Sequence, residues 1–273
     1  MKFYQLLAMG PLLMQALVHG RTVPGNIQSF YTGIVNNQTC QNKLASGFYS
    51  TERSRNTFSY CGDHLDDYKV IYIQGTNGAL ADMDVDCDGD DSPSGDRRCE
   101  SAEEREPETS FQDIIRGYKK EITELNSVRH SWVVLGNVGR KPKFNPKQYG
   151  VLPLSIVAVV CNNQLFYGVW GDEYGVDEDE RHGKQMIGEA SLALATACFG
   201  HSMNGNNGHE PNDVLYIAFP GPDAVPGANG AKWNARSWSE FHASIENLGN
   251  KLIQRIPGAG NWTRPALNSP QWK

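Results

Sequence analysis

The stretch LFYGVWGDEYGVDEDERHGKQMIGEASLALATACFG, residues 165–200, joins two elements around which the rest of the chain is organised. Its first six residues, Leu165 to Trp170, are aromatic and β-branched and end at a glycine, which is typical of a buried strand. An acidic loop follows the strand. The Ala- and Leu-rich run after Glu189 closes at another glycine, and this pattern predicts a helix that begins at Glu189.

Two carboxylates, Asp172 and Glu189, are thereby placed at the ends of two rigid elements with a polar loop between them. Acid/base chemistry on a large substrate needs such a pair, because one group gives a proton while the other takes one. Residue chemistry alone favours a plainer interpretation. In that interpretation Asp172 is a turn residue and Glu189 is a favourable charge at a helix N-terminus.

The N-terminal segment and the charge limit the class of protein. Residues 1–20 carry one lysine and then an apolar stretch, which predicts a secretory signal peptide that is too short to span a bilayer. Residues 21–273 are then expected to form a single secreted catalytic domain, extracellular and monomeric, with no membrane segment. Loss of Lys2 with the signal changes the net charge from −6 to −7, and such an acidic protein disfavours nucleic acid and suits a cationic partner.

Six cysteines remain after the predicted signal peptide. In an oxidising compartment an even number favours three disulfides, for which 15 connectivities exist, and we favour Cys87 with Cys99 as a local loop. Sequons at Asn37 and Asn261 predict glycosylation of an exported, eukaryotic protein, although each is equally compatible with an unmodified surface loop.

An acidic stretch, ADMDVDCDGDD at residues 81–91, is the most unusual composition in the chain. Because side chains alternate along a strand, Asp82, Asp84, Asp86 and Asp88 are expected on one face. The opening matches a calcium-binding EF-hand loop, but Gly95 stands where that loop requires a bidentate Glu. Three interpretations stay open: a different calcium site, the wall of a cation-binding cleft, or a solvated acidic edge.

The remaining elements set the fold class. The chain from about residue 21 to 66 is read as irregular structure with short strands. Elsewhere the patterns predict strands at 68–74, 131–135, 155–161 and 214–219, a hairpin turn at Asn162-Asn163, a helix over 111–128, and a capped helix from Ser237. The strands do not alternate with helices. We therefore predict an α+β fold with a mainly antiparallel, barrel-like β core and two or three packed helices.

Several of these stretches together resemble the secreted fungal chitosanases of glycoside hydrolase family 75. The resemblance extends from about residue 68 to residue 219 and is carried by YIQGTNGALADMDVDCDG (72–89), FYGVWGD (166–172), IGEASLALATACFG (187–200) and NGNNGHEPNDVLYIAF (204–219). It implies endo-hydrolysis of chitosan, a β-1,4-linked glucosamine polymer, with inversion at the anomeric carbon and without a metal or other cofactor.

By motif, the resemblance implies that Asp172 and Glu189 are the catalytic pair. We expect Glu189 to donate the proton, since the apolar residues around it raise a carboxyl pKa by desolvation, and Asp172 to act as the base. A helix N-terminus lowers that pKa, so the reverse assignment stays open. The acidic loop is longer than the family's usual one, so Asp177 or Asp179 is an alternative to Asp172.

Substrate binding has its own candidates. Glucosamine units are cations when protonated, and Asp82, Asp84, Asp86 and Asp177 are expected to bind their ammonium groups. Tyr167 and Trp170 are candidates for stacking on sugar rings. The alternative function is that of a non-catalytic secreted protein that binds carbohydrate or calcium. A third candidate function is that of a copper oxygenase whose mature chain starts at His19.

Overall fold

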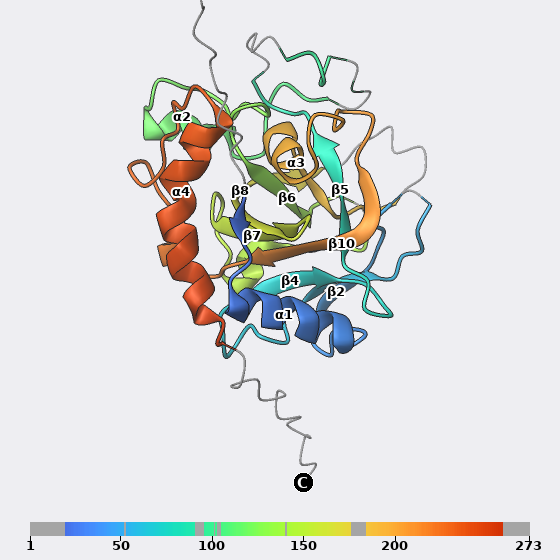
Figure 1. Ribbon diagram of the computed structural model, residues 1–273. Helices are drawn as coiled ribbons and strands as arrows, with labels where there is room; N and C mark the ends of the chain where they lie inside the picture. Colours follow the sequence, from blue (N-terminus) through green and yellow to red (C-terminus); the bar gives the residue numbers. More distant parts are fainter. Residues whose placement is uncertain are drawn as a thin grey trace, which may run out of the picture.

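A computed structural model describes residues 20–51, 53–90, 96–100, 102, 105–139, 141–175 and 184–258. Its strands, shown in Figure 1, are β1 (Arg21–Thr22), β2 (Lys43–Phe48), β3 (Phe58–Cys61), β4 (Ile71–Gln74), β5 (Ala81–Asp86), β6 (Trp132–Asn137), β7 (Ile156–Cys161), β8 (Gln164–Tyr174), β9 (Glu189–Ser191) and β10 (His209–Ala218). The α-helices are α1 (Gly25–Asn36), α2 (Gln112–Tyr118), α3 (Leu192–Phe199) and α4 (Trp238–Leu252), and three short 3-10 helices lie at Pro146–Tyr149, Pro222–Ala224 and Ile253–Arg255.

Six of the strands close into a ring. β8 pairs with β6, β6 with β9, β9 with β5, β5 with β10, β10 with β7, and β7 returns to β8. β4, β3 and β2 continue the sheet beyond β10, and β1 pairs with β8. Within the described ranges only β5–β9 and β6–β8 are parallel pairs. The predicted α+β fold with a mainly antiparallel, barrel-like core is therefore confirmed.

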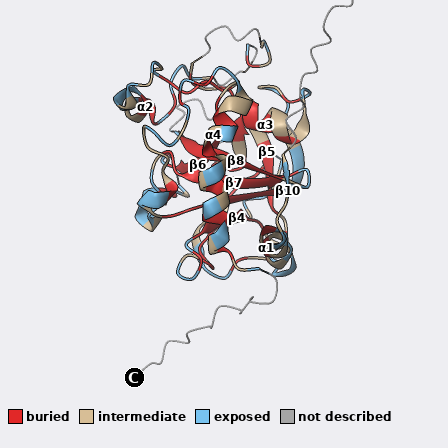
Figure 2. Cartoon of the chain, turned by 60° about the vertical axis from the view of Figure 1, so that its left-hand side comes forward, coloured by how far each residue is buried: buried red, intermediate tan, exposed pale blue. Residues whose placement is uncertain are grey.

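The core lies in and around this ring. Figure 2 shows β6, β7 and β8 coloured almost entirely as buried, whereas the first half of β10 and one side of α4 are exposed. Every residue of β7, IVAVVC, is buried, which explains its run of β-branched residues without alternation. The hairpin to β8 turns at Asn162 and Asn163, both with positive φ, as the predicted two-residue turn requires.

The predictions for the helices were partly wrong. α1 lies in the segment predicted to be irregular, although it buries Ile27, Phe30 and Ile34 at helical spacing. The helix predicted over 111–128 is confined to α2, because Lys119 and Glu121 adopt positive φ and end it. The described part of the chain therefore holds four α-helices rather than two or three.

The helix predicted to begin at Glu189 begins later. Glu189, Ala190 and Ser191 form β9, and α3 starts at Leu192 with Ser191 as its N-cap. The capped helix from Ser237 is confirmed as α4, since the Ser237 side chain accepts a hydrogen bond from the Glu240 backbone N–H. No helix in the described ranges is long and apolar enough to cross a membrane.

Three disulfides join the six cysteines: Cys40–Cys61, Cys87–Cys99 and Cys161–Cys198. The favoured pairing of Cys87 with Cys99 is thus confirmed. Cys161 ends β7 and Cys198 lies near the end of α3, so this bond ties the helix to the ring of strands. Cys87 directly follows β5, so the bond to Cys99 restrains the chain where the acidic strand ends.

Gly188 determines how the chain enters β9. Its φ is +96°, a conformation that L side chains rarely adopt, and a Cβ atom at this position would collide with the carboxylate of Asp82. Only glycine therefore lets β9 lie this close to β5.

We predict that Gly188→Ala lowers the free energy of unfolding by about 2 to 4 kcal/mol, because it combines backbone strain with a steric clash. Gly117→Ala is the matched control, since Gly117 lies in α2 with open space around it and should be neutral or stabilising. Denaturant unfolding of both variants checks this. Equal stability of the two variants would contradict the role given to Gly188.

Candidate active site

Strand register brings acidic residues from distant parts of the chain onto one face. In the parallel pair β5–β9, Asp84 lies opposite Glu189 and Asp86 opposite Ser191. In the parallel pair β6–β8, Val134 lies opposite Asp172. Residues opposite each other on neighbouring strands point to the same side of a sheet.

The strand between them completes a row. β6 and β9 are antiparallel with Val133 opposite Ala190, which places Val134 opposite Glu189. Asp172, Val134, Glu189 and Asp84 therefore form one row across β8, β6, β9 and β5. Because strands are about 4.8 Å apart, two spacings separate the backbones of Asp172 and Glu189 by about 10 Å. The buried Val134 forms the floor between the two carboxyl groups.

Asp172 is held firmly near the end of β8. Its side chain is 5% exposed, and Oδ1 accepts hydrogen bonds from the Ser110 backbone N–H at 3.0 Å, the Ser110 hydroxyl, and the Glu173 N–H at 2.8 Å. Burial and the charge of Asp86 raise the pKa of Asp172 to about 8, although these donors favour the ionised form.

Asp86, at the end of β5, lies beside Asp172. Carboxylate oxygens of Asp86, Asp88 and Asp172 all lie within 4.8 Å of one another, although β5 and β8 are separated by two strands. This part of the sheet therefore curls around the carboxylates. Trp132 donates its indole N–H to Asp86 Oδ2, and the Asp88 N–H donates to Oδ1 at 2.8 Å. Burial and the charge of Asp88 raise the pKa of Asp86 to about 7.

Glu189 differs from Asp172 in its surroundings. Its side chain is partly exposed, and no donor within the described ranges makes a hydrogen bond to its carboxyl group. Burial and the charges of Asp86 and Asp84, in that order, raise the pKa of Glu189 well above its ordinary value. Hydrogen bonds thus favour the anion at Asp172 and not at Glu189, so Glu189 is the better place for a proton.

The other expected site residues are spread more widely. Asp84 lies beside Glu189 in the row, whereas Asp82 is fully buried and accepts a hydrogen bond from the Ser50 hydroxyl. Asp177 falls outside the described residues. Burial and the charge of Asp84 raise the pKa of Asp82 to about 9.

The two expected stacking residues lie in the interior. Tyr167 has no exposed surface, and its hydroxyl donates to Asn250 of α4 at 2.9 Å. Trp170 is equally buried, packs edge-on against Phe111, and donates its indole N–H to the Asp172 carbonyl at 2.9 Å. A fully buried ring offers no face to a sugar, so neither residue enters the site proposed below.

Sequence reasoning missed two residues that hold the carboxylates. Ser110 stands in a polar loop and Trp132 at the start of a strand, and nothing in the local pattern marks either one. Their roles arise from contacts with residues 62 positions away for Ser110 and 46 positions away for Trp132.

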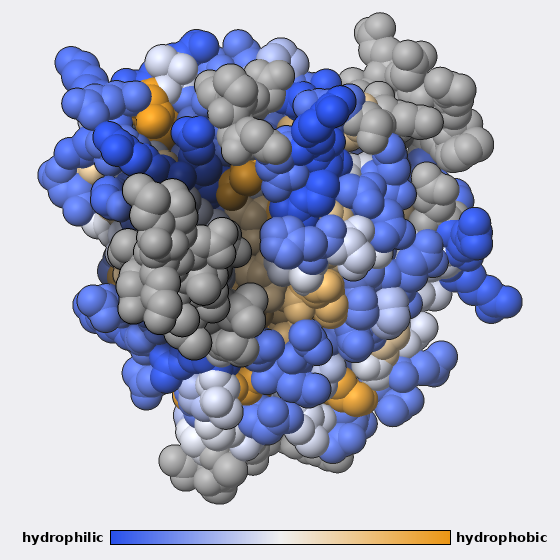
Figure 3. All heavy atoms as spheres, turned by 45° about the horizontal axis from the view of Figure 1, so that its top comes forward, coloured by the Kyte–Doolittle hydropathy of each residue, from blue (hydrophilic) through white to orange (hydrophobic). Residues whose placement is uncertain are grey.

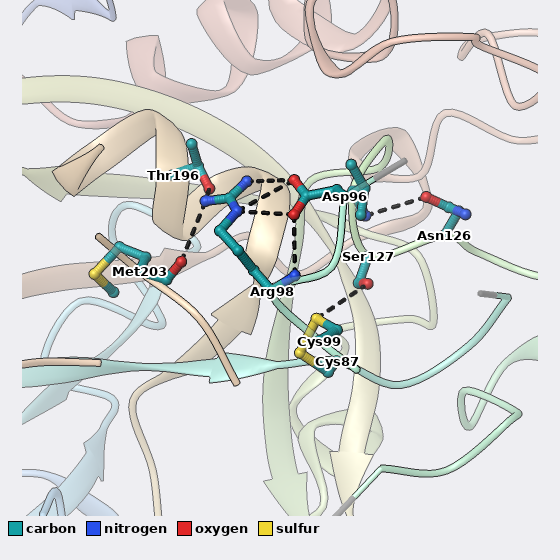
Figure 4. A network of polar contacts seen from close by, with 9 residues as sticks. Cys87, Asp96, Arg98, Cys99, Asn126, Ser127, Thr196 and Met203 are labelled. Atoms are coloured by element: carbon teal, nitrogen blue, oxygen red, sulfur yellow. Dashed lines mark hydrogen bonds and ion pairs between the residues drawn. A yellow bond between two sulfur atoms is a disulfide. The ribbon is translucent and has the colours of Figure 1, made fainter. Parts of the chain in front are cut away.

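A polar network braces the chain after β5, as Figure 4 shows. Arg98 forms a two-pronged ion pair with Asp96 and also donates to the Thr196 hydroxyl at 2.7 Å and to the Met203 carbonyl at 3.2 Å. Thr196 belongs to α3, so the network and the neighbouring Cys87–Cys99 bond tie the segment after Asp86 to that helix.

A cavity of about 360 Å³ lies between Gly89 and Asp90 on one side and Gln112 and Glu124 on the other, and Asp86, Asp172 and Glu189 do not line it. Figure 3, which brings the top of Figure 1 forward, shows a recess with a less hydrophilic floor between strongly hydrophilic walls.

The oxygens of Asp86, Asp88 and Asp172 are also the kind that calcium binds, but calcium takes six to eight of them. Here N–H donors already point at both Asp86 oxygens and at Asp172 Oδ1. Such donors stabilise a negative charge where a cation would otherwise do so. Three of the oxygens that a calcium ion would need therefore already accept hydrogen bonds, so the arrangement suits a calcium cage poorly.

Comparison with known proteins gives a consistent result. Residues 83–255 match the family described as fungal chitosanase of glycosyl hydrolase group 75. The chain is 40% identical over 247 residues to an endo-chitosanase of Aspergillus fumigatus, covering 89% of this chain and 96% of that protein. It is 36% identical to endo-chitosanase B of Aspergillus oryzae, again covering 89% and 96% of the two chains.

The raised pKa values predict how stability depends on pH. The folded state binds protons more tightly than the unfolded state at Asp82, Asp86 and Asp172, whose pKa values rise from 3.8 to about 9, 7 and 8. Their contribution to stability is therefore complete below about pH 4 and is lost as the pH rises through 7 to 9.

We predict that the melting temperature of wild type falls by on the order of 5 °C between about pH 5 and pH 8. The melting temperature of Asp172→Asn should fall less over this range, so that the variant melts at a higher temperature than wild type at about pH 8. Calorimetry over this range measures both. A melting temperature that rises over the interval, or an unchanged slope in the variant, would show that these carboxyl groups are not protonated in the folded protein.

Proposed function

Because the chain belongs to the fungal chitosanases of glycosyl hydrolase group 75, we propose that it is a secreted endo-chitosanase that inverts the anomeric carbon, with Glu189 as acid and Asp172 as base. The proposal assigns catalysis to one domain that follows the signal peptide. Three disulfides support export to an oxidising compartment. The family and the relatives support the activity, and the geometry of the site supports the residue roles.

The observation that carries the residue roles is the row in which Val134 separates Asp172 from Glu189. Inverting hydrolases hold their two carboxyl groups roughly 6.5 to 9.5 Å apart, which leaves room for a water molecule beneath the sugar. Retaining enzymes hold theirs closer, at roughly 5 to 5.5 Å. The backbones of Asp172 and Glu189 are about 10 Å apart across two strands, and the curl of the sheet brings their carboxyl groups closer than this, so the row is compatible with the wider arrangement.

The reaction then proceeds in one displacement. Glu189 gives its proton to the glycosidic oxygen as the bond from that oxygen to the anomeric carbon breaks. Water attacks the same carbon from the opposite face, and Asp172 takes the proton that this water loses. Exchange with solvent returns the proton from Asp172 and restores the proton on Glu189.

Charge around the pair supports a cationic substrate. Asp84 stands next to Glu189 in the row, and Asp88 lies beside Asp86 and Asp172. A sugar carrying an ammonium group lowers the repulsion among these carboxylates when it binds, whereas a neutral sugar does not. This favours glucosamine over acetylated units next to the cleaved bond.

We predict that Asp172→Asn and Glu189→Gln each fold and each lose at least about 10³-fold in kcat on soluble, largely deacetylated chitosan, because each removes one proton-transfer group. Release of reducing ends at matched concentrations of folded protein measures this. Glu173→Gln is the control, since Glu173 adjoins Asp172 but pairs with Lys147 and should keep activity within about tenfold.

A variant of Asp172 or Glu189 that retains a tenth of wild-type turnover would move the chemistry to another residue. A wild-type protein with no activity on chitosan, on chitin or on glucan would instead favour a non-catalytic carbohydrate-binding role.

A further inference from the structure

We propose that Asp86 is a positioning residue of this site: it shares a proton with Asp172 and thereby sets the pH at which Asp172 becomes an active base. The inference rests on the proposed function and adds a third carboxyl group to it. Asp86 does not touch the substrate in this scheme. It acts through Asp172, whose carboxylate oxygens lie within 4.8 Å of its own, and its charge also raises the pKa of Glu189.

Proximity and burial carry the first step. Oxygens of Asp86 and Asp172 lie within 4.8 Å of each other, and the two side chains are 4% and 5% exposed. Two carboxylates this close in a desolvated site repel each other strongly, and the repulsion falls when only one of the two is ionised. Ionisation of one member of the pair therefore opposes ionisation of the other.

The hydrogen bonds decide how that charge is divided. Asp86 receives the Trp132 indole N–H on one oxygen and the Asp88 N–H on the other, so both of its oxygens are stabilised as an anion. All three donors to Asp172 converge on Oδ1. Oδ2 of Asp172 is thus the oxygen available to carry the shared proton and, once ionised, to take one from water.

The other charged groups around the pair act in known directions. Asp88 and Glu106 raise the pKa of Asp86, and Asp84 and Glu189 lie on the adjoining strands of the row. Glu173 points away and pairs with Lys147, whose ammonium group lies over the Phe111 and Trp170 rings. The lysine therefore pairs with Glu173 and not with Asp86 or Asp172. Of the charged groups, Asp86 raises the pKa of Asp172 the most.

The consequence is a shift in the pH profile. If the charge of Asp86 is removed, Asp172 ionises at a lower pH, because nothing beside it then opposes its ionisation as strongly. Asp172 must be ionised to act as base, so the acid limb of the kcat/KM profile moves toward lower pH. A residue with only a structural role would lower activity at all pH values without moving the limb.

The experiment compares kcat/KM between about pH 3 and pH 9 for wild type and Asp86→Asn on soluble chitosan. We expect the acid limb to move down by about one pH unit or more. Asp82→Asn is the matched control, because Asp82 is an equally buried acid on the same strand whose carboxylate bonds to Ser50, and its limb should not move.

A second variant, Trp132→Phe, tests the same inference if Asp86→Asn does not fold. Trp132→Phe keeps every carboxyl group and removes only the indole donor to Asp86, so the shared proton moves toward Asp86 and the limb should move the same way by less. An unmoved acid limb in folded Asp86→Asn and Trp132→Phe would overturn the inference.

Failure of the proposed function gives different results. Wild type without activity on chitosan would refute that function and leave no profile to compare. Because the charge of Asp86 also raises the pKa of Glu189, the alkaline limb of Asp86→Asn is expected to move toward lower pH as well. A shift of the alkaline limb alone, with the acid limb fixed, would overturn Asp86 as the residue that sets the base.

Discussion

Repulsion between acidic side chains on neighbouring strands is the constraint on which the rest of this structure depends. Asp84, Asp86, Asp172 and Glu189 come from three strands, and the register points them to one face. Each would lower its free energy by turning to water. The fold instead keeps Asp86 and Asp172 almost fully buried, and this is possible only where protons or hydrogen-bond donors reduce the charge.

The surrounding structure supplies both kinds of relief. Trp132 and the Asp88 backbone donate to Asp86, and Ser110 and the Glu173 backbone donate to Asp172, the proposed base. Glu189, without such donors in the described ranges, keeps its proton more readily. The ring of strands fixes the row, and the Cys87–Cys99 bond with the Arg98 network holds the chain after β5 in place. In the proposed mechanism, acid and base thus differ through their environment and not their residue type.

Local patterns in the sequence predicted those parts of the fold that local chemistry decides. The Asn162-Asn163 turn and the Ser237 cap each depend on neighbouring residues, and both are present. The α1 helix was missed although its apolar spacing is regular, because the surrounding segment is polar. Glu189 was assigned to a helix because β9 is only three residues long, and its conformation is set by pairing with β5 and β6.

The candidate site also has features that the sequence could predict and features that depend on distant contacts. Motif resemblance pointed to Asp172 and Glu189, and register places them in one row with Asp84. The alternation of side chains along β8 could not reveal that Tyr167 is covered by α4, since that depends on a helix about 80 residues later. The parallel pairing of β5 with β9 joins residues more than 100 positions apart, and no short-range pattern encodes it.

The most direct test of this account is the configuration of the first product. Proton NMR during the initial minutes of chitosan hydrolysis distinguishes the two anomers of the new reducing end before they equilibrate. Two carboxyl groups set two strands apart should release the α-anomer first, because water attacks opposite the departing β-linked oxygen. Initial release of the β-anomer would mean a covalent intermediate, and it would contradict the assignment of Asp172 as a base that activates water.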